Sequence, residues 1–586
     1  MATLRTIRTL RPLRSAQWWW RARYLLERKL RSTAPHRIPY RRAPGAQAPP
    51  LRDDLPDVPL FHLPGLTGSE AVAALAEGRW EHLNRSRIIG RVRPHWGLGL
   101  VESEKLWTLE LYGHHWACAL AEHAAAAPSE AGLAETLFEH YVGDWIQRCG
   151  PTEPGAHVLA WNSFVLATRT VNWIRSYRRL HSTLFARRPA FRTAFLRTLW
   201  EQCAFLHDHI EWDLRGNHLF RDAVGLAWGG RFFEGDEPRR WLRTAEQLAR
   251  SQVSEQVLQD GGHFERSTMY QLQMMEEVLA LAHLLDDAAA PRACLDAWQL
   301  MAEFLAWMRH PDGHIAIFND ATVGFHGSPE DAFRLGAAVG RVVDPERRRG
   351  ARHFPNTGYA AWQGDPWTVF LDAGPVGPDV QSSHAHADTL SMECSCGTDR
   401  LIVDPGTFGY DLDDRRRYDR STSAHNTVTI DDTSSSEVWH IFRTGRRAKP
   451  IDVRVEATPA HLDLSAAHDG YDHLPGRPRH RRRVVVGTSI PLTVEDEVLG
   501  RGRHAIEGGF LVAPSWRCTP QPGGWQLARN GRRVLLSLQG PPRLQLYTEK
   551  KTYHPDFGVE LEAERVGWRI DGDLPVRVVA RFDLEA

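Results

Sequence analysis

The sequence predicts a multidomain α+β protein with a helical region followed by an antiparallel β-sandwich. The chain has 586 residues, which is too long for one ordinary hydrophobic core, so we expect two or three domains. Helical periodicity dominates residues 56–350, and short β-branched segments dominate residues 351–586. A basic arm with a Pro-rich linker, residues 1–55, precedes both regions.

The helical region is recognised by apolar residues that recur on one side of a helix. Leu272, Met275 and Leu279 have this spacing in the segment MYQLQMMEEVLALAHLL. Gly, Pro and Asp separate one helical segment from the next, and no strand-like segment lies between them. Consecutive helices of this kind are typical of an α/α arrangement.

The C-terminal region consists of short segments such as RLIVDPGTF, RRRVVVGTSI and RRVLLSLQG. They are rich in β-branched residues and bounded by turn residues. No helical run of any length interrupts them, so we expect an antiparallel sandwich.

Composition narrows the classes of partner. Lys and Arg number 72, Asp and Glu also number 72, and the net charge is therefore zero with His neutral. Because the net charge is zero, no long-range electrostatic field favours binding of nucleic acid or a membrane. An acidic substrate would therefore have to bind at a local basic site. Seven cysteines form no disulfide framework in a chain of this length and are expected to be structural thiols. No apolar window is long enough for a transmembrane helix.

The first thirty residues are rich in arginine but lack the apolar stretch and cleavage site of a secretory signal. We therefore expect a cytoplasmic location, with the periplasm as the alternative. The arm has three interpretations: a transit peptide, a basic interfacial helix with Trp18, Trp19 and Trp20 at its boundary, or an arm that packs on the body. The last is favoured.

Two clusters in the helical region carry groups suited to chemistry. Asn217 and His218 are adjacent, and an amide beside an imidazole can bind a carboxylate, although a capping Asn beside a surface His explains them equally well. Tyr270 ends the Gly-rich segment GGHFERSTMY, where Ser267 or Thr268 is expected to cap a helix.

Two further clusters lie in the β region. His384, His386 and Asp388 alternate, so in a strand they would share one face, and a second acid, Asp404, follows. Imidazole and carboxylate groups together can ligate zinc. His425, in RSTSAHNTV, adds another imidazole just before a strand.

In this order the segments NHL, GGHFERSTMY, HAHADTLSMECSCGTDRLIVDPGTFGYD and RSTSAHNTVTIDD resemble the signatures of the heparinase II/III-like family of polysaccharide lyases. The similarity extends from roughly residue 60 to the C-terminus. It implies an incomplete (α/α) toroid followed by a layered antiparallel β-sandwich. That order agrees with the helix-then-strand pattern.

The resemblance also implies a reaction, the β-elimination of a uronic-acid-containing glycan. Asn217 with His218 matches the position that neutralises the uronate carboxylate. Tyr270 matches the catalytic tyrosine, which acts as acid and for some stereochemistries also as base, and His384 matches the catalytic histidine, a candidate base. The implied partner is an acidic polysaccharide.

His386, Asp404 and His425 match the family's zinc positions, and a metal there would be structural because β-elimination needs no activated water. Two positions depart from the family. Gln271 stands where many members have His, and Arg221 stands where the heparinase II branch has Glu. The specificity of that branch is therefore not transferred, and Arg221 is either a carboxylate- or sulfate-binding residue or a charge on the helix surface.

Two alternatives stay open. One is a catalytically weak glycan-binding or processing protein of exopolysaccharide biosynthesis. The other is a zinc-dependent hydrolase using His384, His386 and Asp404. The sequence does not choose among heparan sulfate, alginate, hyaluronan and bacterial exopolysaccharides, nor between a monomer and a dimer.

Overall fold

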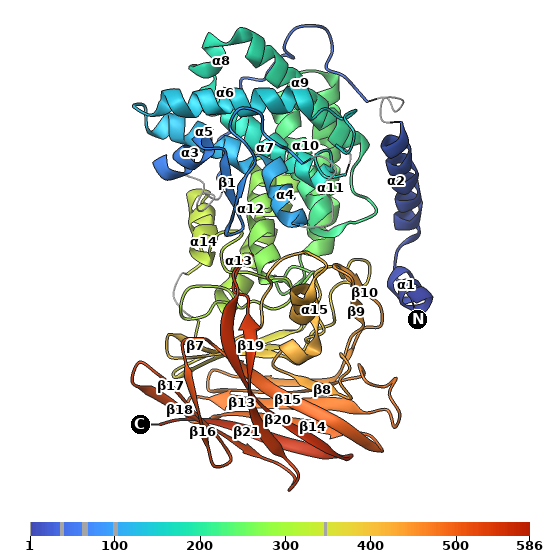
Figure 1. Ribbon diagram of the computed structural model, residues 1–586, viewed down its shortest axis with the longest axis vertical. Helices are drawn as coiled ribbons and strands as arrows, with labels where there is room; N and C mark the ends of the chain where they lie inside the picture. The colour runs from blue at the N-terminus through green and yellow to red at the C-terminus, as the bar shows by residue number, and fades with distance from the viewer. Residues whose placement is uncertain are drawn as a thin grey trace. The chain divides into compact units, whose positions relative to one another are not determined.

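The computed structural model describes residues 2–34, 40–60, 68–97, 104–156, 158–344 and 348–585. The chain divides into two compact units (Figure 1). We call Leu13–Glu255 with Met274–Trp298 the helical unit. We call Met1–Pro12, Gln256–Gln273 and Gln299–Ala586 the sheet unit.

Helices make up almost all of the helical unit. They are α2 (Ser15–Thr33), α3 (Ser69–Ala76), α4 (Lys105–Gly113), α5 (His115–Ala126), α6 (Ala131–Arg148), α7 (Ser163–Leu180), α8 (Leu184–Arg187), α9 (Pro189–Asp208), α10 (Gly216–Phe232) and α11 (Asp236–Gln256). Two more helices contribute residues to both units, α12 (Thr268–Leu284) and α13 (Ala289–Trp307).

Helix α7 lies at the centre of the helical unit, in contact with α4, α5, α9 and α10. It is buried on nearly every side, including Val165, Leu166 and Trp173, as expected of a helix surrounded by others. Its approach to α10 depends on Gly225, because a Cβ there would lie 2.7 Å from the Cα of Ala167. The predicted α/α arrangement is confirmed.

One expectation for this region is wrong, because a β-hairpin lies between two of its helices. Strands β1 (Arg79–His82) and β2 (Arg85–Ile88) pair antiparallel around Leu83 and Asn84, which have φ of 53° and 56°. Two left-handed residues are typical of a two-residue hairpin turn, but that turn is usually marked by Asn-Gly. Because Leu83 stands where Asn is usual, the Asn-Gly signal that would have predicted the hairpin is missing.

The sheet unit contains two large antiparallel sheets. The eight-stranded sheet has the order β11-β12-β13-β14-β21-β18-β17-β16. Its strands are β11 (Pro450–Ala457), β12 (His461–His468), β13 (Arg479–Gly487), β14 (Leu492–Leu499), β16 (Arg517–Gln521), β17 (Gly524–Arg529), β18 (Arg532–Gln539) and β21 (Val576–Leu584).

The nine-stranded sheet has the order β19-β20-β15-β7-β6-β5-β4-β3, with β8 paired to β15. Its strands are β3 (Gly350–Phe354), β4 (Tyr359–Gln363), β5 (Trp367–Asp372), β6 (Met392–Cys396), β7 (Asp399–Ile402), β8 (Val428–Ile430), β15 (Arg503–Val512), β19 (Gln545–Tyr553) and β20 (Leu561–Asp573). A small hairpin joins β9 (Val438–Trp439) to β10 (Arg443–Thr444).

The two large sheets face each other as a sandwich. Phe582 of β21 contacts Phe510 of β15 and Trp367 of β5 across the interface, with ring centroids 5.2 and 6.4 Å apart. Burial alternates along β14, as expected when one face of a strand meets the core. The predicted fold class, helices followed by an antiparallel sandwich, is confirmed.

Three short helices also belong to the sheet unit, the N-terminal α1 (Ala2–Leu10) and the loop helices α14 (Pro329–Ala338) and α15 (Asp414–Arg420). A 3-10 turn spans Thr422–Ala424. Helix α15 contradicts the expectation that no helix interrupts the strands. Its seven residues, DRRRYDR, carry no apolar periodicity that would have predicted a helix. All seven cysteines are free thiols, as expected. No helix in the described part of the chain is long and apolar enough to cross a bilayer.

Candidate active site and metal centre

Tyr270 stands in the first turn of α12, and the preceding loop fixes its position. Ser267 caps the helix, because its Oγ accepts a hydrogen bond from the backbone N–H of Tyr270 at 3.2 Å. The same hydroxyl donates to the carbonyl of Asp320 at 2.6 Å. The predicted cap is therefore present, and it joins the helix start to a second loop.

The phenol of Tyr270 lies between two aromatic neighbours. Its hydroxyl is 2.9 Å from the hydroxyl of Tyr410, and its ring centroid is 4.2 Å from that of His384. Burial raises the pKa of Tyr270 well above its ordinary value, and the nearby charge of Asp320 raises it further. The phenol is consequently held in its protonated form.

His384 lies in a loop, which corrects the expectation that residues 384–388 form a strand. Alternation along a strand therefore does not bring His384 and His386 together. They converge because both reach the same carboxylate, with His384 Nδ1 and His386 Nε2 each 2.9 Å from an oxygen of Asp320. The second imidazole nitrogen of His384, Nε2, lies 3.9 Å from the nearer oxygen of Glu265.

Asp320 is the centre of this group. Arg416 also donates to both of its oxygens, from Nη1 to Oδ1 and from Nη2 to Oδ2, the latter at 2.8 Å. Burial by itself would raise the pKa of Asp320, but the charge of Arg416 and the hydrogen bonds from both histidines hold that pKa well below its ordinary value. Asp320 is therefore an anion that orients two imidazoles.

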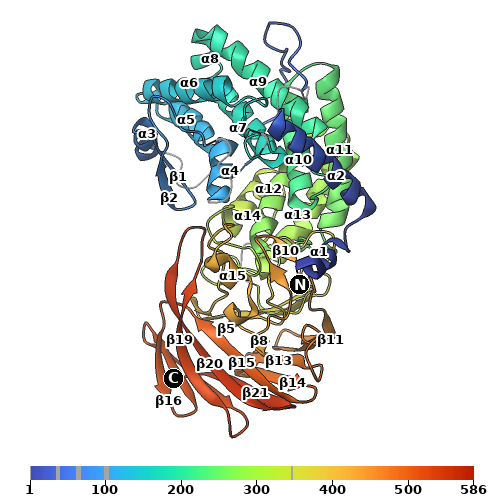
Figure 2. The ribbon, with the colours of Figure 1, turned by 45° about the vertical axis from the view of Figure 1, so that its right-hand side comes forward.

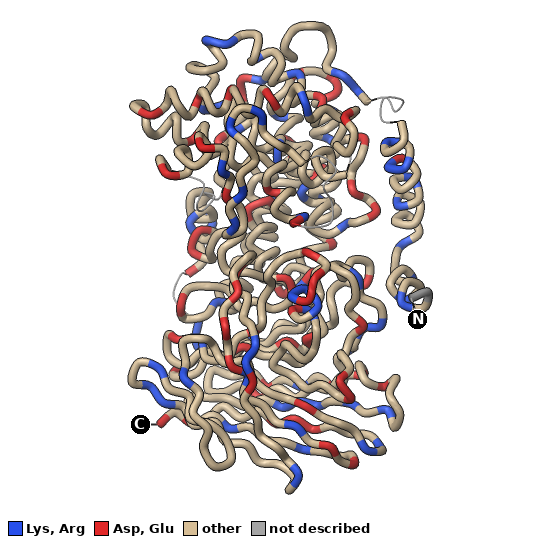
Figure 3. The backbone as a smooth tube through the Cα atoms, in the orientation of Figure 1, with Lys and Arg blue, Asp and Glu red and all other residues tan. Residues whose placement is uncertain are grey.

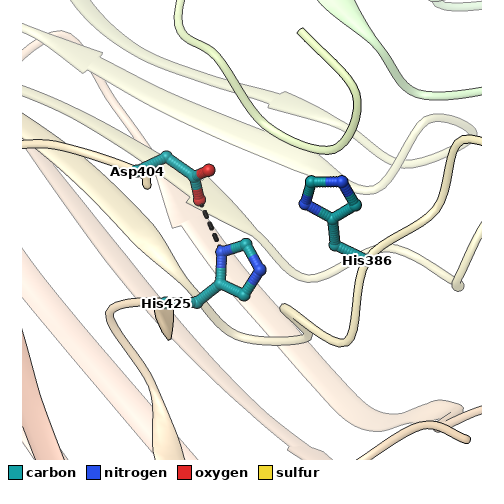
Figure 4. Close-up of side chains that lie close together, drawn as sticks. All are labelled: His386, Asp404 and His425. Atoms are coloured by element: carbon teal, nitrogen blue, oxygen red, sulfur yellow. Dashed lines mark hydrogen bonds and ion pairs between the residues drawn. The ribbon is translucent and has the colours of Figure 1, made fainter. Parts of the chain in front are cut away.

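The predicted metal residues come together in the sheet unit (Figure 4). One ligand atom each of His386, Asp404 and His425 lies within 4.8 Å of the others, and all three side chains are buried. His425 Nδ1 lies 2.8 Å from Asp404 Oδ2. Within the described structure, His386 Nδ1 and His425 Nε2 have no hydrogen-bond partner.

These features fit a divalent cation. Two buried imidazole nitrogens without a partner are costly unless something accepts their lone pairs. Burial lowers the pKa of His386 to about 3, so the ring is neutral and able to ligate. The hydrogen bond from His386 Nε2 to Asp320 is the kind of contact that orients a metal-binding histidine from behind.

Asn217 and His218 stand in the first turn of α10, in the helical unit. Asn217 is buried, whereas the ring of His218 is partly exposed and packs on Phe164 with centroids 4.9 Å apart. His218 Nδ1 lies 3.1 Å from Glu211 Oε2. An imidazole that bonds a carboxylate on one nitrogen can donate from the other when it is protonated.

The two departures from the family pattern both have structural partners. Arg221 Nε lies 2.7 Å from Glu277 Oε1 and the side chain is largely buried, so it is no exposed surface charge, whereas binding of a carboxylate or sulfate stays a prediction. Gln271 is buried; it accepts from the N–H of His263 at 2.6 Å and donates to the carbonyl of Gly261 at 2.8 Å. It stabilises the Gly-rich turn before Tyr270.

Three residues of this site were not predicted from the sequence: Asp320, Tyr410 and Arg416. Asp320 lies in FNDATVGF, which carries no recognisable motif. Arg416 is buried in the middle of DDRRRYDR, although its neighbours Arg415 and Arg417 are exposed. Tyr410, in GTFGYD, was the only one with a signal, an aromatic residue just after Asp404.

Comparison with known proteins identifies the family and the fold. The heparinase II/III N-terminus family matches residues 92–331, and the heparinase II/III-like C-terminal family matches residues 346–580. The crystal structure of heparinase III shares the fold, with a TM-score of 0.75 over 91% of this chain and 88% of that chain at 17% identity.

Two curated relatives are similar over part of their length. A heparin-sulfate lyase of Bacteroides stercoris is 21% identical over 378 residues, which is 59% of this chain and 53% of the relative. The FtsZ-localized protein C of Caulobacter vibrioides is 28% identical over 342 residues, which is 55% of this chain and 56% of the relative. The matched segments thus span little more than half of either relative. Since the two heparinase II/III matches together account for most of the sequence, the chain belongs to the heparinase II/III-like family.

Proposed function

We propose that this protein is a polysaccharide lyase that cleaves a uronic-acid-containing glycan by β-elimination. The observation that carries the proposal is the contact between the phenol of Tyr270 and the imidazole of His384, with Asp320 on the other side of that imidazole. A protonated phenol beside an oriented imidazole supplies an acid and a base within one group of residues.

His384 is the base. Its Nδ1 bonds the anionic Asp320, so this nitrogen carries the proton and Nε2 keeps its lone pair. The lone pair removes the proton at C5 of the uronate, and the electrons form the C4–C5 double bond as the C4–O bond breaks. Asp320 is a positioning residue that fixes the tautomer and stabilises the imidazolium.

Tyr270 is the acid. Its raised pKa keeps the phenol protonated at neutral pH, so it can give its proton to the departing C4 oxygen. Tyr410 holds the hydroxyl through the 2.9 Å contact between the two phenol oxygens. General acid and base groups of this kind each contribute about 10²–10⁴-fold.

Asn217 and His218 bind the uronate carboxylate. An amide N–H and an imidazolium donate to carboxylate oxygens, and this interaction strengthens as negative charge spreads from C5 toward the carboxylate. Without that stabilisation the C5 proton is too weakly acidic to be removed. The contact of His218 Nδ1 with Glu211 Oε2, at 3.1 Å, orients the ring.

The substrate we propose is a glycosaminoglycan or a bacterial glycan with comparable uronate units. The support is the similarity to a protein named heparin-sulfate lyase. We also propose that His386, Asp404 and His425 hold a structural zinc ion. The ion would supply a fixed cross-link among the loops that carry these residues, and the histidine and carboxylate donor set suits it.

The test is a screen of the purified protein against heparan sulfate, chondroitin, hyaluronan, alginate and bacterial uronate polysaccharides. β-Elimination is detected by the near-ultraviolet absorbance of the unsaturated product. The expected result is product from at least one glycan, abolished in Tyr270→Phe and His384→Ala. Full activity in both variants would overturn the assigned roles, and a saturated product would indicate a hydrolase instead.

A catalytically weak glycan-binding protein is the second candidate. It is favoured by the similarity to FtsZ-localized protein C, whose name specifies a location rather than a lyase. Binding of a glycan in the same panel, without any product over extended incubation, would support this candidate over the lyase.

A further inference from the structure

Helix α2 is attached to the helical unit through its polar side. The amide of the buried Gln17 donates to the carbonyl of Asp213 at 3.1 Å, and the hydroxyl of Tyr24 donates to the carbonyl of Ile210 at 2.6 Å. Glu27, which accepts from the buried Arg31 at 2.8 Å, lies 2.6 Å from Nε2 of His209. The predicted packing of the arm on the body is therefore present, and it combines these polar contacts with the ring of Trp20, whose centroid lies 6.4 Å from that of Trp212.

The apolar side of α2 faces the solvent. Its exposed residues have between 45% and 62% of their surface accessible: Trp18, Trp19, Leu25, Leu26 and Leu30. At about 100° per residue these five lie within an arc of roughly 140°, which also contains Ala22 and the exposed Lys29. A surface helix normally turns such a stripe toward the body of the protein, whereas α2 turns it toward the solvent. Contiguous exposed apolar surface of this kind marks an interaction site.

The charges around this stripe define its partner. Residues 2–33 contain one acidic residue, Glu27, and nine basic residues: Arg5, Arg8, Arg11, Arg14, Arg21, Arg23, Arg28, Lys29 and Arg31. Figure 3 shows the basic positions recurring along α1 and α2. In the described structure the salt bridges involve none of Arg11, Arg23, Arg28 or Lys29. Because the whole chain has no net charge, this concentration is local.

We propose that α2 docks on the surface of a bilayer that contains anionic phospholipid. Trp18 and Trp19 would occupy the headgroup boundary, the three leucines would enter the acyl region, and the unpaired cations would meet lipid phosphates. The guanidinium of Arg23 lies 4.8 Å from the ring of Trp20, so cationic and aromatic groups already share one border of the stripe.

A second copy of this chain is a poorer occupant. In a symmetric dimer the same patch meets itself, so the basic residues of one α2 would face those of the other. A bilayer surface instead supplies negative charge and apolar depth together. Docking leaves the polar side of α2 on the helical unit, so it requires none of the contacts of Gln17, Tyr24 or Arg31 to break.

The test is flotation of the full chain with two kinds of vesicle, phosphatidylcholine alone and phosphatidylcholine containing roughly a third phosphatidylglycerol. We expect the protein to float only with the anionic vesicles, and binding to weaken when salt is raised to about 0.5 M. The double variant Trp19→Gln/Leu26→Gln should bind at least about tenfold more weakly. Its circular dichroism and glycan cleavage should not change.

The matched control is Ile88→Gln/Leu133→Gln, which changes two exposed apolar residues elsewhere in the helical unit. It should float like the unchanged protein. Equal flotation with both kinds of vesicle, or undiminished flotation of the α2 variant, would overturn the proposal. So would an absence of flotation together with a concentration-dependent dimer that the α2 variant abolishes, since that result would identify a second copy as the partner. None of these outcomes depends on the lyase assignment.

Discussion

The two groups of predicted catalytic residues use similar side chains in opposite electrostatic surroundings. In the sheet unit, Tyr270 and His384 gather around one carboxylate, Asp320, whose charge Arg416 balances. In the helical unit, Asn217 and His218 belong to a region with several carboxylates. His218 contacts Glu211, whose own backbone N–H donates to Asp222 at 2.7 Å.

If both groups act in the proposed reaction, they do so in different electrostatic surroundings. Around Asp320 one carboxylate is paired with one guanidinium, and burial together with the charge of Asp320 keeps the neighbouring phenol protonated. Around Glu211 the acids do not all ionise, because burial and the charge of Glu211 raise the pKa of Asp222 well above its ordinary value. If α10 binds an anionic sugar as proposed, the short-range donors of Asn217 and His218 make the contact.

The largest effect is expected from removal of the phenol proton donor. Tyr270→Phe should lower kcat by about 10²–10⁴-fold, because no other acid serves the departing oxygen. Tyr410→Phe is the matched control, since it removes the other hydroxyl of the same hydrogen bond. Its kcat should fall by less than about tenfold. Equal losses in the two variants would show that the hydrogen bond, rather than Tyr270 itself, carries the effect.

The next effect is on stability. Asp320→Asn leaves the buried guanidinium of Arg416 without its carboxylate, and we expect the free energy of unfolding of the sheet unit to fall by about 3–5 kcal/mol. Glu495→Gln removes the partner of the exposed Arg577 in the same unit and should cost at most about 1 kcal/mol. Denaturant unfolding of both variants measures the contrast. A similar, small change in both would mean that Asp320 is not the hub of a buried network.

These residues also mark what could be predicted from the sequence. Tyr270, His384 and the three proposed metal ligands lie in long motifs, which is why they could be singled out as candidates, and the order of helices and strands followed from periodicity. Asp320 is 64 positions from His384, and Arg416 is 96 positions from Asp320, so their contacts depend on how loops meet in three dimensions. No local pattern separates a buried Arg416 from its two exposed neighbours.

A smaller, substrate-dependent effect is expected in the helical unit. Asn217→Ala should lower kcat/KM by about 10–10²-fold on a uronate glycan, the cost of one lost donor to a developing anion. On the same glycan with its carboxylates methyl-esterified, the loss should shrink to a few-fold, because an ester needs no neutralisation. Tyr270→Phe should be equally damaging on both substrates. If esterification did not change the effect of Asn217→Ala, the residue would have a structural role.

The smallest expected effect is a shift in the pH profile, and it tests how Asp320 acts on Tyr270. The phenol must be protonated to act as an acid, and its pKa is raised by burial and by the charge of Asp320. The kcat of the unchanged protein should therefore show no alkaline decline below about pH 10. Asp320→Asn removes the negative charge, which lowers the pKa of Tyr270 and moves any alkaline decline toward neutral pH. The stability of the fold changes with pH in the same direction. Because the pKa of Tyr270 is higher in the folded protein than in the unfolded protein, its contribution to the free energy of unfolding is fully present below the unfolded pKa of about 10. That contribution is lost as the pH rises further. An alkaline decline that Asp320→Asn leaves in place would mean that another group controls it, and that the charge of Asp320 is not felt at the phenol.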